Sequence, residues 1–331
     1  EVGLDWRMFK QRFGLDLAFY NNITRNQILD VPMDQTTGYT KATMNSGKVR
    51  NRGIELQLDG TPVKTKNFTW NSTFTWAKNY NKVLSLAAGL TDGQTIAYTG
   101  GTNCALIAKV GGSIGDIYGY KLKRAPDGQV VWKDGITART TEFEYVGNAY
   151  PAWKAGFSNE FSYKNFRVSI LFDGQWGGIV YSQTHHKMTE HGTLKHTLKY
   201  RENPNFEVVG EGVMLDERGQ YVPNNVPISV SKYYADYWRR ANVETNSFDA
   251  SFLKLREARI EYTIPSAGLN KIGIERLTLA LYGRNLAMWT KDFPVYDPEV
   301  ATLNNGTIVP GSEMGQLPST RTMGFNLTLK F

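Results

Sequence analysis

The sequence predicts an all-β fold in which antiparallel strands form part of the wall of a transmembrane β-barrel. Nine segments alternate apolar and polar residues with the period of two expected of a strand with two different faces. Short and very long connections alternate between these segments, and aromatic residues gather at the segment ends. These three observations together favour a membrane barrel with long extracellular loops.

The composition agrees with many strands that each carry one polar face. Of the 331 residues, 41% are hydrophobic and 13% are aromatic, yet the mean hydropathy is negative. No run of 18 apolar residues occurs, so the sequence predicts no transmembrane helix. Barrel strands need only about 10 residues with one apolar side, so they remain compatible with this composition.

The first four strands are predicted as two hairpins. Alternating segments at 1–9 and 13–20 are separated by only three residues, which fits a tight turn between antiparallel neighbours. A long polar stretch, Asn21 to Ser46, follows. The next alternating segments, at 54–59 and 68–76, are joined by a short turn at Thr61 to Lys66.

Strands five and six follow a connection of Asn81 to Ala152. Apolar and polar residues alternate from Trp153 to Tyr163 and again from Phe166 to Asp173. The two residues between them, Lys164 and Asn165, suit a hairpin turn.

The last three strands follow another very long connection, Gly177 to Asn246. A strand that ends near Pro265 is followed by one at 277–284, and the loop Lys291 to Ser319 leads to the final strand. One face of this final strand is apolar up to the chain end, with Met323, Phe325, Leu327, Leu329 and Phe331.

This alternation of short and long connections should place all long loops at one end of the sheet. Structureless connections above about 15 residues are uncommon in compact domains, and four of them on one side are typical of outer-membrane barrels. The polar face would line a wet lumen with the charged residues Asp5, Arg7, Asp16, Glu55, Arg167, Asp173, Glu261 and Arg284. A one-residue slip would move these charges into hydrocarbon, at about 2 to 4 kcal/mol for each Arg or Lys near the midplane.

Aromatic residues near strand ends predict the belts that a barrel places at the two membrane interfaces. The predicted belt residues are Trp6, Tyr20, Trp76, Trp153, Tyr163, Trp176, Tyr262 and Trp289. The competing interpretation is a soluble β-sandwich with aromatic residues at the ends of its core.

No catalytic constellation is present, so we do not expect an enzyme. The net charge of +7 is spread without a Lys/Arg block, which argues against nucleic acid as a partner. Cys104, in a loop-like stretch, is interpreted as incidental. Four histidines between His185 and His196 match no compact zinc pattern, so we expect a solvated loop and no metal, and residues 126–135 lack the acidic density of a calcium loop.

One aromatic segment in the long loops is a candidate ligand site. Residues 231–241 predict a short helix that carries several rings beside a cation, and stacking on sugars or holding a peptide or a partner would suit such a surface. The candidate ligand-binding residues are Trp176, Tyr233, Tyr234, Tyr237, Trp238 and Arg239. The alternative is that these rings pack the loop onto its neighbours.

Several motifs along the chain resemble the SusC/RagA family of TonB-dependent outer-membrane transporters. The similarity is spread over essentially the whole chain, and its order is more specific than any single motif. The motifs lie at 51–56 (Asn-Arg-Gly-Ile-Glu-Leu), 115–120 (Gly-Asp-Ile-Tyr-Gly-Tyr), 162–166, 251–265, 282–286, 296–299 (Tyr-Asp-Pro-Glu) and 324–331.

The resemblance implies a 22-stranded barrel with an N-terminal plug, of which this chain would be the last nine or so strands. It also implies TonB as the energy source, a SusD-like lipoprotein lid, outer-membrane lipid around the wall, and oligosaccharides or oligopeptides as cargo. Dimers of transporter and lid pairs are a further expectation. Phe325, Leu327, Leu329 and Phe331 would form the signal that the barrel-assembly machinery recognises.

Residues 1–6 already have the pattern of a strand, so we expect the plug and the first strands to lie upstream of this chain. Two rival functions remain open from the sequence. One is a plugless outer-membrane barrel that acts as an adhesin or an enzyme, and the other is a soluble carbohydrate-binding β-sandwich.

Overall fold

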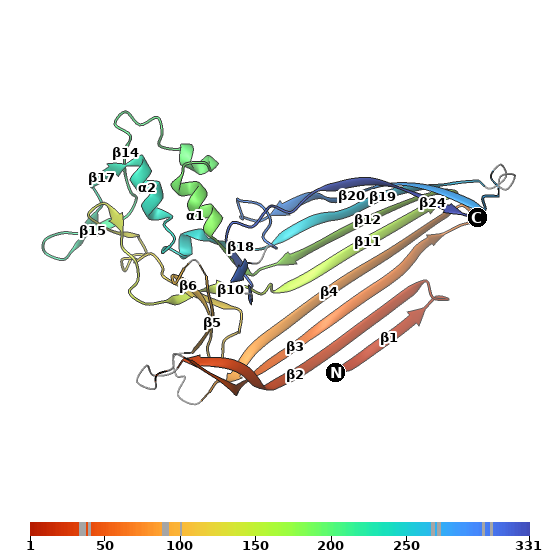
Figure 1. The fold of residues 1–331 in the computed structure, drawn as a ribbon, viewed down its shortest axis with the longest axis horizontal. Helices are drawn as coiled ribbons and strands as arrows, with labels where there is room; N and C mark the ends of the chain where they lie inside the picture. The colour runs from red at the N-terminus through yellow and green to blue at the C-terminus, as the bar shows by residue number, and fades with distance from the viewer. Residues whose placement is uncertain are drawn as a thin grey trace.

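The computed structural model describes residues 1–331 except 33–37, 39–40, 88–92, 100, 266–268, 270–272, 300–301 and 305–306. Its main element is a nine-stranded antiparallel sheet in which consecutive wall strands are neighbours (Figure 1). The strands, in order across the sheet, are β1 (Val2–Met8), β2 (Phe13–Pro32), β3 (Lys41–Lys64), β4 (Phe68–Ser85), β11 (Trp153–Tyr163), β12 (Phe166–Trp176), β19 (Phe252–Ile264), β20 (Arg276–Thr290) and β24 (Thr322–Lys330).

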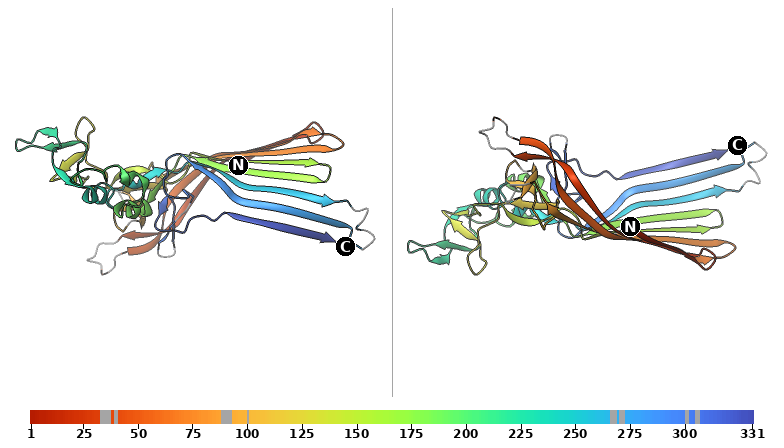
Figure 2. Two further views of the ribbon diagram at one scale, coloured as in Figure 1. Left: turned by 90° about the horizontal axis from the view of Figure 1, so that it is seen from above. Right: turned by 90° about the horizontal axis from the view of Figure 1, so that it is seen from below.

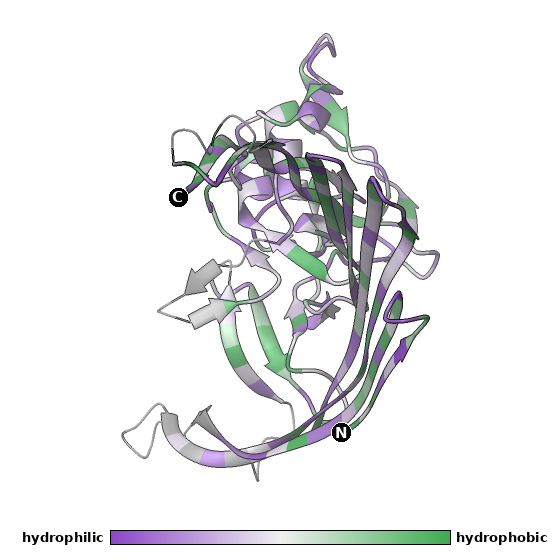
Figure 3. Ribbon diagram, turned by 90° about the vertical axis from the view of Figure 1, so that its right-hand side faces the viewer, coloured by the Kyte–Doolittle hydropathy of each residue, from purple (hydrophilic) through white to green (hydrophobic). Residues whose placement is uncertain are grey.

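All nine predicted strands occur in this sheet, and the sheet forms an arc with β1 and β24 at its edges (Figures 2 and 3). The short turns lie at one end and the long connections at the other (Figure 1). No helix in the described part of the chain is long and apolar enough to cross a membrane.

Three predicted connections differ from the structure at their ends. The connection Asn81 to Ala152 begins later than predicted, because β4 continues to Ser85. The stretch Asn21 to Ser46 is mostly strand, because β2 continues to Pro32 and β3 begins at Lys41. The turn predicted at Thr61 to Lys66 is also shorter, since β3 extends to Lys64 and β4 starts at Phe68.

The register of the sheet aligns apolar side chains into rows that cross several strands. Leu15 pairs with Leu58, Leu58 with Phe74, Phe74 with Phe157, and Phe157 with Phe172. Because side chains alternate between faces, all members of such a row share one side of the sheet, which we call the outward face. A continuous apolar outward face is what a membrane barrel presents to lipid.

The opposite, inward face carries the predicted charged residues, and several of them pair across strands. The guanidinium of Arg7 lies 2.9 Å from a carboxylate oxygen of Asp16, and that of Arg284 lies 2.9 Å from Glu257. Arg167 lies 3.9 Å from Glu261. These pairs confirm the common charged face that the polar alternation of the sequence predicts.

Seven of the eight predicted belt aromatics lie on the outward face by strand alternation. Trp153 and Trp176 are paired in the register and stack with ring centroids 6.4 Å apart. Tyr20 is the exception, since it shares the inward face with Asp16 and its hydroxyl donates to Asn79 at 3.1 Å. Its position depends on Gly53 across the ladder, where a Cβ would lie 2.4 Å from the Tyr20 hydroxyl oxygen.

The long connections fold into short elements beyond the end of the sheet, and we call these together the loop lobe (Figure 1). Its helical elements are α1 (Gln183–Glu190), η2 (Lys195–Leu198), α2 (Val230–Tyr237) and η3 (Glu244–Asn246). Its strands are β5 (Gln94–Thr99), β6 (Cys104–Ala108), β7 (Asp116–Gly119), β8 (Val131–Lys133), β9 (Ile136–Thr137), β10 (Glu144–Asn148), β13 (Ile179–Ser182), β14 (Glu207–Val209), β15 (Val213–Leu215), β16 (Tyr221–Pro223), β17 (Pro227–Ser229), β18 (Ser247–Asp249), β21 (Thr302–Asn304), β22 (Thr307–Val309) and β23 (Ser312–Glu313).

The loop lobe has hydrophobic clusters to which different connections contribute. One cluster joins Cys104, Ile117, Tyr181, Val243 and Val309. Cys104 is fully buried at the start of β6, so the loop position expected for it is wrong. The connections therefore form a packed unit rather than separate structureless loops.

Candidate functional site

The inward face of the sheet has a hollow of about 760 Å³ near the loop lobe. Lys154 and Gln175 mark its level, because they lie one residue inside the loop-side ends of β11 and β12. Carboxylates from both halves of the sheet line it, namely Asp5, Asp16, Glu55 and Asp173, and the last loop adds Glu299.

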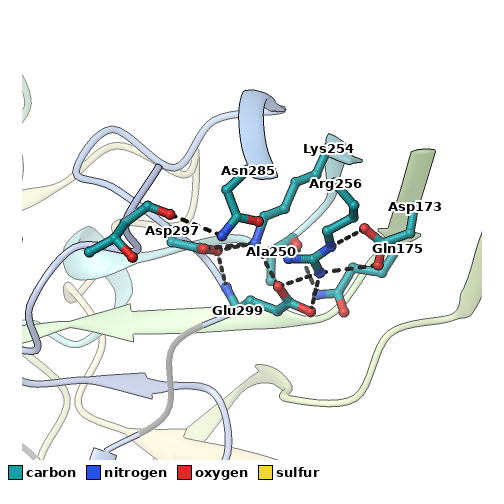
Figure 4. A network of polar contacts seen from close by, with 9 residues as sticks. Asp173, Gln175, Ala250, Lys254, Arg256, Asn285, Asp297 and Glu299 are labelled. Carbon is teal, nitrogen blue, oxygen red and sulfur yellow. Dashed lines mark hydrogen bonds and ion pairs between the residues drawn. The ribbon is translucent and has the colours of Figure 1, made fainter. Parts of the chain in front are cut away.

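A buried ion network anchors the last loop to the wall beside this hollow (Figure 4). Lys254, near the start of β19, has 2% of its surface exposed and donates to both carboxylate oxygens of Asp297 at 2.7 Å. Its ammonium also donates to Glu299 at 2.6 Å. Two carboxylates of the loop thus share one ammonium of the wall.

Arg256 extends the network to a third element (Figure 4). Its guanidinium donates to Glu299 at 2.7 and 2.6 Å and forms a two-point ion pair with Asp173 of β12. The Tyr-Asp-Pro-Glu motif at 296–299 therefore supplies carboxylates that fix the loop against β12 and β19. Its Glu299 also lines the hollow.

The predicted aromatic helix exists as α2, although it ends at Tyr237, before the predicted Ala241. Most of its rings pack inside the loop lobe. Tyr233 and Tyr237 stack on Trp132, with centroids 6.1 Å away in both cases, and Trp132 is 1% exposed. Tyr234 is buried, and its hydroxyl donates to the His196 carbonyl at 2.8 Å.

Trp238 and Arg239 also take part in packing at the end of α2. Trp238 stacks on Tyr234 with centroids 5.5 Å apart. The Arg239 guanidinium donates to the Thr137 carbonyl at 2.9 Å and lies 3.3 Å from Asp236. These contacts match the packing alternative, and they leave only partly exposed edges of Tyr233, Tyr237, Trp238 and Arg239 for a ligand or partner.

Trp176, the remaining candidate ligand residue, lies apart from this cluster. It is half exposed on the outward face of β12, stacked on Trp153, and the Lys291 ammonium lies 5.2 Å from its ring centroid. Its surroundings are those of an interfacial belt residue, not of the aromatic helix.

Two of the four histidines are buried in a helix, so the expectation of a solvated loop is wrong for this part of the segment. His185 and His186 of α1 are 3% and 5% exposed. The His185 ring lies 2.9 Å from the side-chain oxygen of Asn246 and stacks on His196 with centroids 5.3 Å apart. No group of His, Cys, Asp or Glu placed to hold a metal occurs among the described residues.

Burial lowers the pKa of His185 to about 4, and it also lowers the pKa of His186 and His196. An exposed histidine in an unfolded loop titrates near pH 6.5. The unfolded segment therefore binds a proton more readily than the folded one, and its stability falls as the pH drops from about 6.5 to 4.

We expect α1 to lose about 2 kcal/mol of local stability between neutral pH and pH 5 through His185 alone. Hydrogen exchange of residues 183–190 in the whole transporter, measured across this pH range, checks the loss. The variant His185→Asn should flatten the pH dependence, whereas His191→Gln, at an exposed position, should retain it. Equal pH profiles for wild type and His185→Asn would contradict the assignment.

The sequence analysis missed a buried carboxylate that joins two long connections. Glu313 is fully buried, and it accepts hydrogen bonds from the hydroxyls of Ser182 and Thr184, both at 2.5 Å, and from the Gly315 amide at 2.8 Å. These donors surround the first turn of α1, so Glu313 fixes that helix to the last loop. The three-residue spacing of ordinary capping motifs could not reveal this contact between residues about 130 positions apart.

The last strand pairs with β20 from Thr322 to Lys330. Its apolar row is strongly exposed, with Met323 at 72%, Phe325 at 79% and Phe331 at 77%. Leu327 and Leu329 belong to the same exposed row. An exposed apolar row of this kind is what a barrel strand presents to lipid.

Comparison with known proteins gives one family. The family model described as "TonB dependent receptor-like, beta-barrel" matches residues 1–286. TonB-dependent receptor P26 of Formosa agariphila is 29% identical over 361 aligned residues, covering 100% of this chain and 34% of the relative. TonB-dependent receptor SusC of Bacteroides thetaiotaomicron is 24% identical over 193 residues, covering 54% of this chain and 19% of that protein.

A solved structure of the RagAB peptide transporter has the same fold. It superposes with a TM-score of 0.69 at 20% sequence identity, covering 99% of this chain and 34% of that one. The closed-closed state of the RagAB peptide importer gives a TM-score of 0.70 at 21% identity, covering 99% and 35%. The chain thus spans about a third of the length of the relatives that match it over its whole length.

Proposed function

Because the chain belongs to the TonB dependent receptor-like β-barrel family, an integral, multi-pass β-barrel family of the cell outer membrane, we propose that it takes part in nutrient import through that membrane. We propose that it forms the last nine strands of a 22-stranded plugged barrel. Oligosaccharides or oligopeptides would be the cargo, and TonB would supply energy through the upstream plug. The sheet with one apolar and one charged face is the observation that carries this proposal.

We propose gated passage as the mechanism of this part of the barrel. Cargo bound between the loop lobe and a SusD-like lid would move into the hollow on the inward face when TonB pulls on the plug. The ion network around Lys254 supports this role, because it holds the last loop against the wall beside the hollow that Glu299 lines.

The candidate residues divide between three roles in this proposal. Exposed edges of Tyr233, Tyr237, Trp238 and Arg239 would contact the lid or the cargo. Tyr234 would support them from inside the lobe, and Trp176 would anchor the wall at the membrane interface. Phe325, Leu327, Leu329 and Phe331 would form the assembly signal, and two transporter and lid pairs would associate as a dimer.

The proposal predicts energy-dependent uptake by the whole transporter. Cells that carry it should take up labelled oligosaccharides or oligopeptides, and uptake should be lost in cells without TonB and in cells without the lid lipoprotein. Parallel assays with the two cargo classes identify the substrate. Surface binding of cargo should persist without TonB, because capture precedes the energised step.

The uptake assay also separates the rival functions. A plugless adhesin or enzyme would act equally with and without TonB. Solubility of the isolated chain without detergent would instead favour a carbohydrate-binding sandwich.

A further inference from the structure

The outward face of three strands changes from apolar to basic beyond the aromatic belt. The last residue pair between β11 and β4 is Lys154 with Ala77, so residues 78–85 of β4 continue past the end of β11. β2 and β3 extend in the same direction (Figure 1). Six cations lie on the outward face of this extension by strand alternation, and the outermost two are Arg25 and Lys48. The four nearer the belt are Arg50, Arg52, Lys78 and Lys82, which we call the basic strip.

The register fixes the height of the basic strip above the membrane. Lys78 lies in line with Trp153 of the belt, one position beyond the pair of Ala77 and Lys154. Arg52 pairs with Tyr80 and Arg50 with Lys82. At about 3.3 Å per residue, these two pairs lie roughly 7 and 13 Å beyond the belt, at the depth of lipid headgroups.

Strand alternation and packing show that the strip points away from the loop lobe. Val49 and Val83, next to Arg50 and Lys82, are buried against Ala108 of the lobe. The even-numbered neighbours must therefore face the other way, on the side that carries the apolar rows. Arg52 and Lys82 are exposed there.

The strip has no anionic partner among the residues that the structure describes. None of its four cations forms an ion pair with a described carboxylate, and no Asp or Glu shares its face within 49–54 or 78–85. Two of its cations contact the ring of Tyr80, whose centroid lies 4.8 Å from the Lys78 ammonium and 5.7 Å from the Arg52 guanidinium carbon. The Nε atom of Arg50 is buried without a hydrogen-bond partner.

We propose that the basic strip binds the phosphate groups of phosphorylated glycolipid in the outer leaflet of the membrane. Guanidinium groups match phosphate oxygens with two parallel hydrogen bonds, and ammonium groups add point charges. The strip continues directly from the lipid-facing rows, so a lipid whose chains pack on those rows would place its headgroup against these cations. The inference rests on the outer-membrane location and is independent of the cargo.

The test uses the whole transporter in phosphatidylcholine nanodiscs, with lipid A titrated in and bound lipid counted by native mass spectrometry. The variant R50Q/R52Q/K78Q/K82Q should weaken the apparent affinity for lipid A by roughly 100-fold or more, given the attraction of each basic residue to an anionic surface. A matched control, K10Q/K64Q/K66Q/K164Q, removes four exposed cations from the turn end and should bind like wild type. The smaller variant R52Q/K78Q provides the same comparison if the fourfold variant fails to fold.

Two further binding measurements identify the chemical group that the basic strip recognises. Dephosphorylated lipid A should bind wild type as weakly as the fourfold variant binds lipid A, and free inorganic phosphate should not displace bound lipid. Equal binding by the strip variant and wild type, an equal loss in the control, or equal binding of dephosphorylated lipid would each overturn the proposal. Displacement of bound lipid A by free phosphate would contradict the assignment of a lipid as the ligand of the basic strip.

Discussion

Replacing Lys254 by methionine should release the last loop from the barrel wall. Methionine keeps the length of the side chain but leaves the Asp297 carboxylate, 4% exposed, without its cation. Removing one partner of a buried ion pair costs about 3 to 5 kcal/mol, because the other charge stays buried and uncompensated. Hydrogen exchange of residues 293–299 in the whole transporter should therefore show a local opening free energy lower by about this amount.

A neighbouring ion pair provides a matched control for Lys254→Met. Lys291 lies 2.6 Å from Asp249, but half of its side chain is exposed, so Lys291→Met should change the opening free energy by about 0 to 1 kcal/mol. The double variant Lys254→Met with Asp297→Leu should recover part of the loss, since it removes both charges. Similar exchange rates in Lys254→Met and Lys291→Met would contradict the role given to this network.

The strands and their register were predictable because one face of each strand meets a uniform apolar surrounding. Apolar and polar residues therefore alternate with a period of two in segments such as Trp153 to Tyr163, whose bounds agree with β11. The pattern fades where the strand leaves the membrane. For this reason the sequence predicts a polar connection at Asn21 to Ser46, although β2 and β3 continue through most of it as paired strands with polar residues on both faces.

The interior of the loop lobe was less predictable because its contacts join distant parts of the chain. The aromatic segment of α2 stood out in the sequence, but its main partner, Trp132, lies about 100 residues earlier. Asp297 and its cation are 43 residues apart, and Glu313 and its donors are about 130 apart. Local patterns in a single sequence do not show which distant residues pair. The sequence therefore shows aromatic and charged residues in the loops but not the partners that they contact.

The two faces of β24 predict that a cation is costly at an outward position and tolerated at the neighbouring inward one. Leu327 pairs with Leu279 on the outward face, and Asn326 pairs with Ala280 on the inward face, both in the middle of the strand. Leu327→Arg should destabilise the assembled barrel by about 2 to 4 kcal/mol, the cost of a basic side chain near the bilayer midplane.

Asn326→Arg is the matched control, because the same side chain one position away points into the wet interior beside the charged face. The unfolding free energy of the whole transporter in lipid vesicles measures both effects, and heat-dependent gel mobility reports the fraction that assembles. Leu327→Arg should lower both quantities, and Asn326→Arg should leave them near wild type. A larger loss from Asn326→Arg than from Leu327→Arg would show that the two faces of β24 are assigned the wrong way round. It would then also contradict the register from which the lipid-facing row, the charged interior and the basic strip are placed.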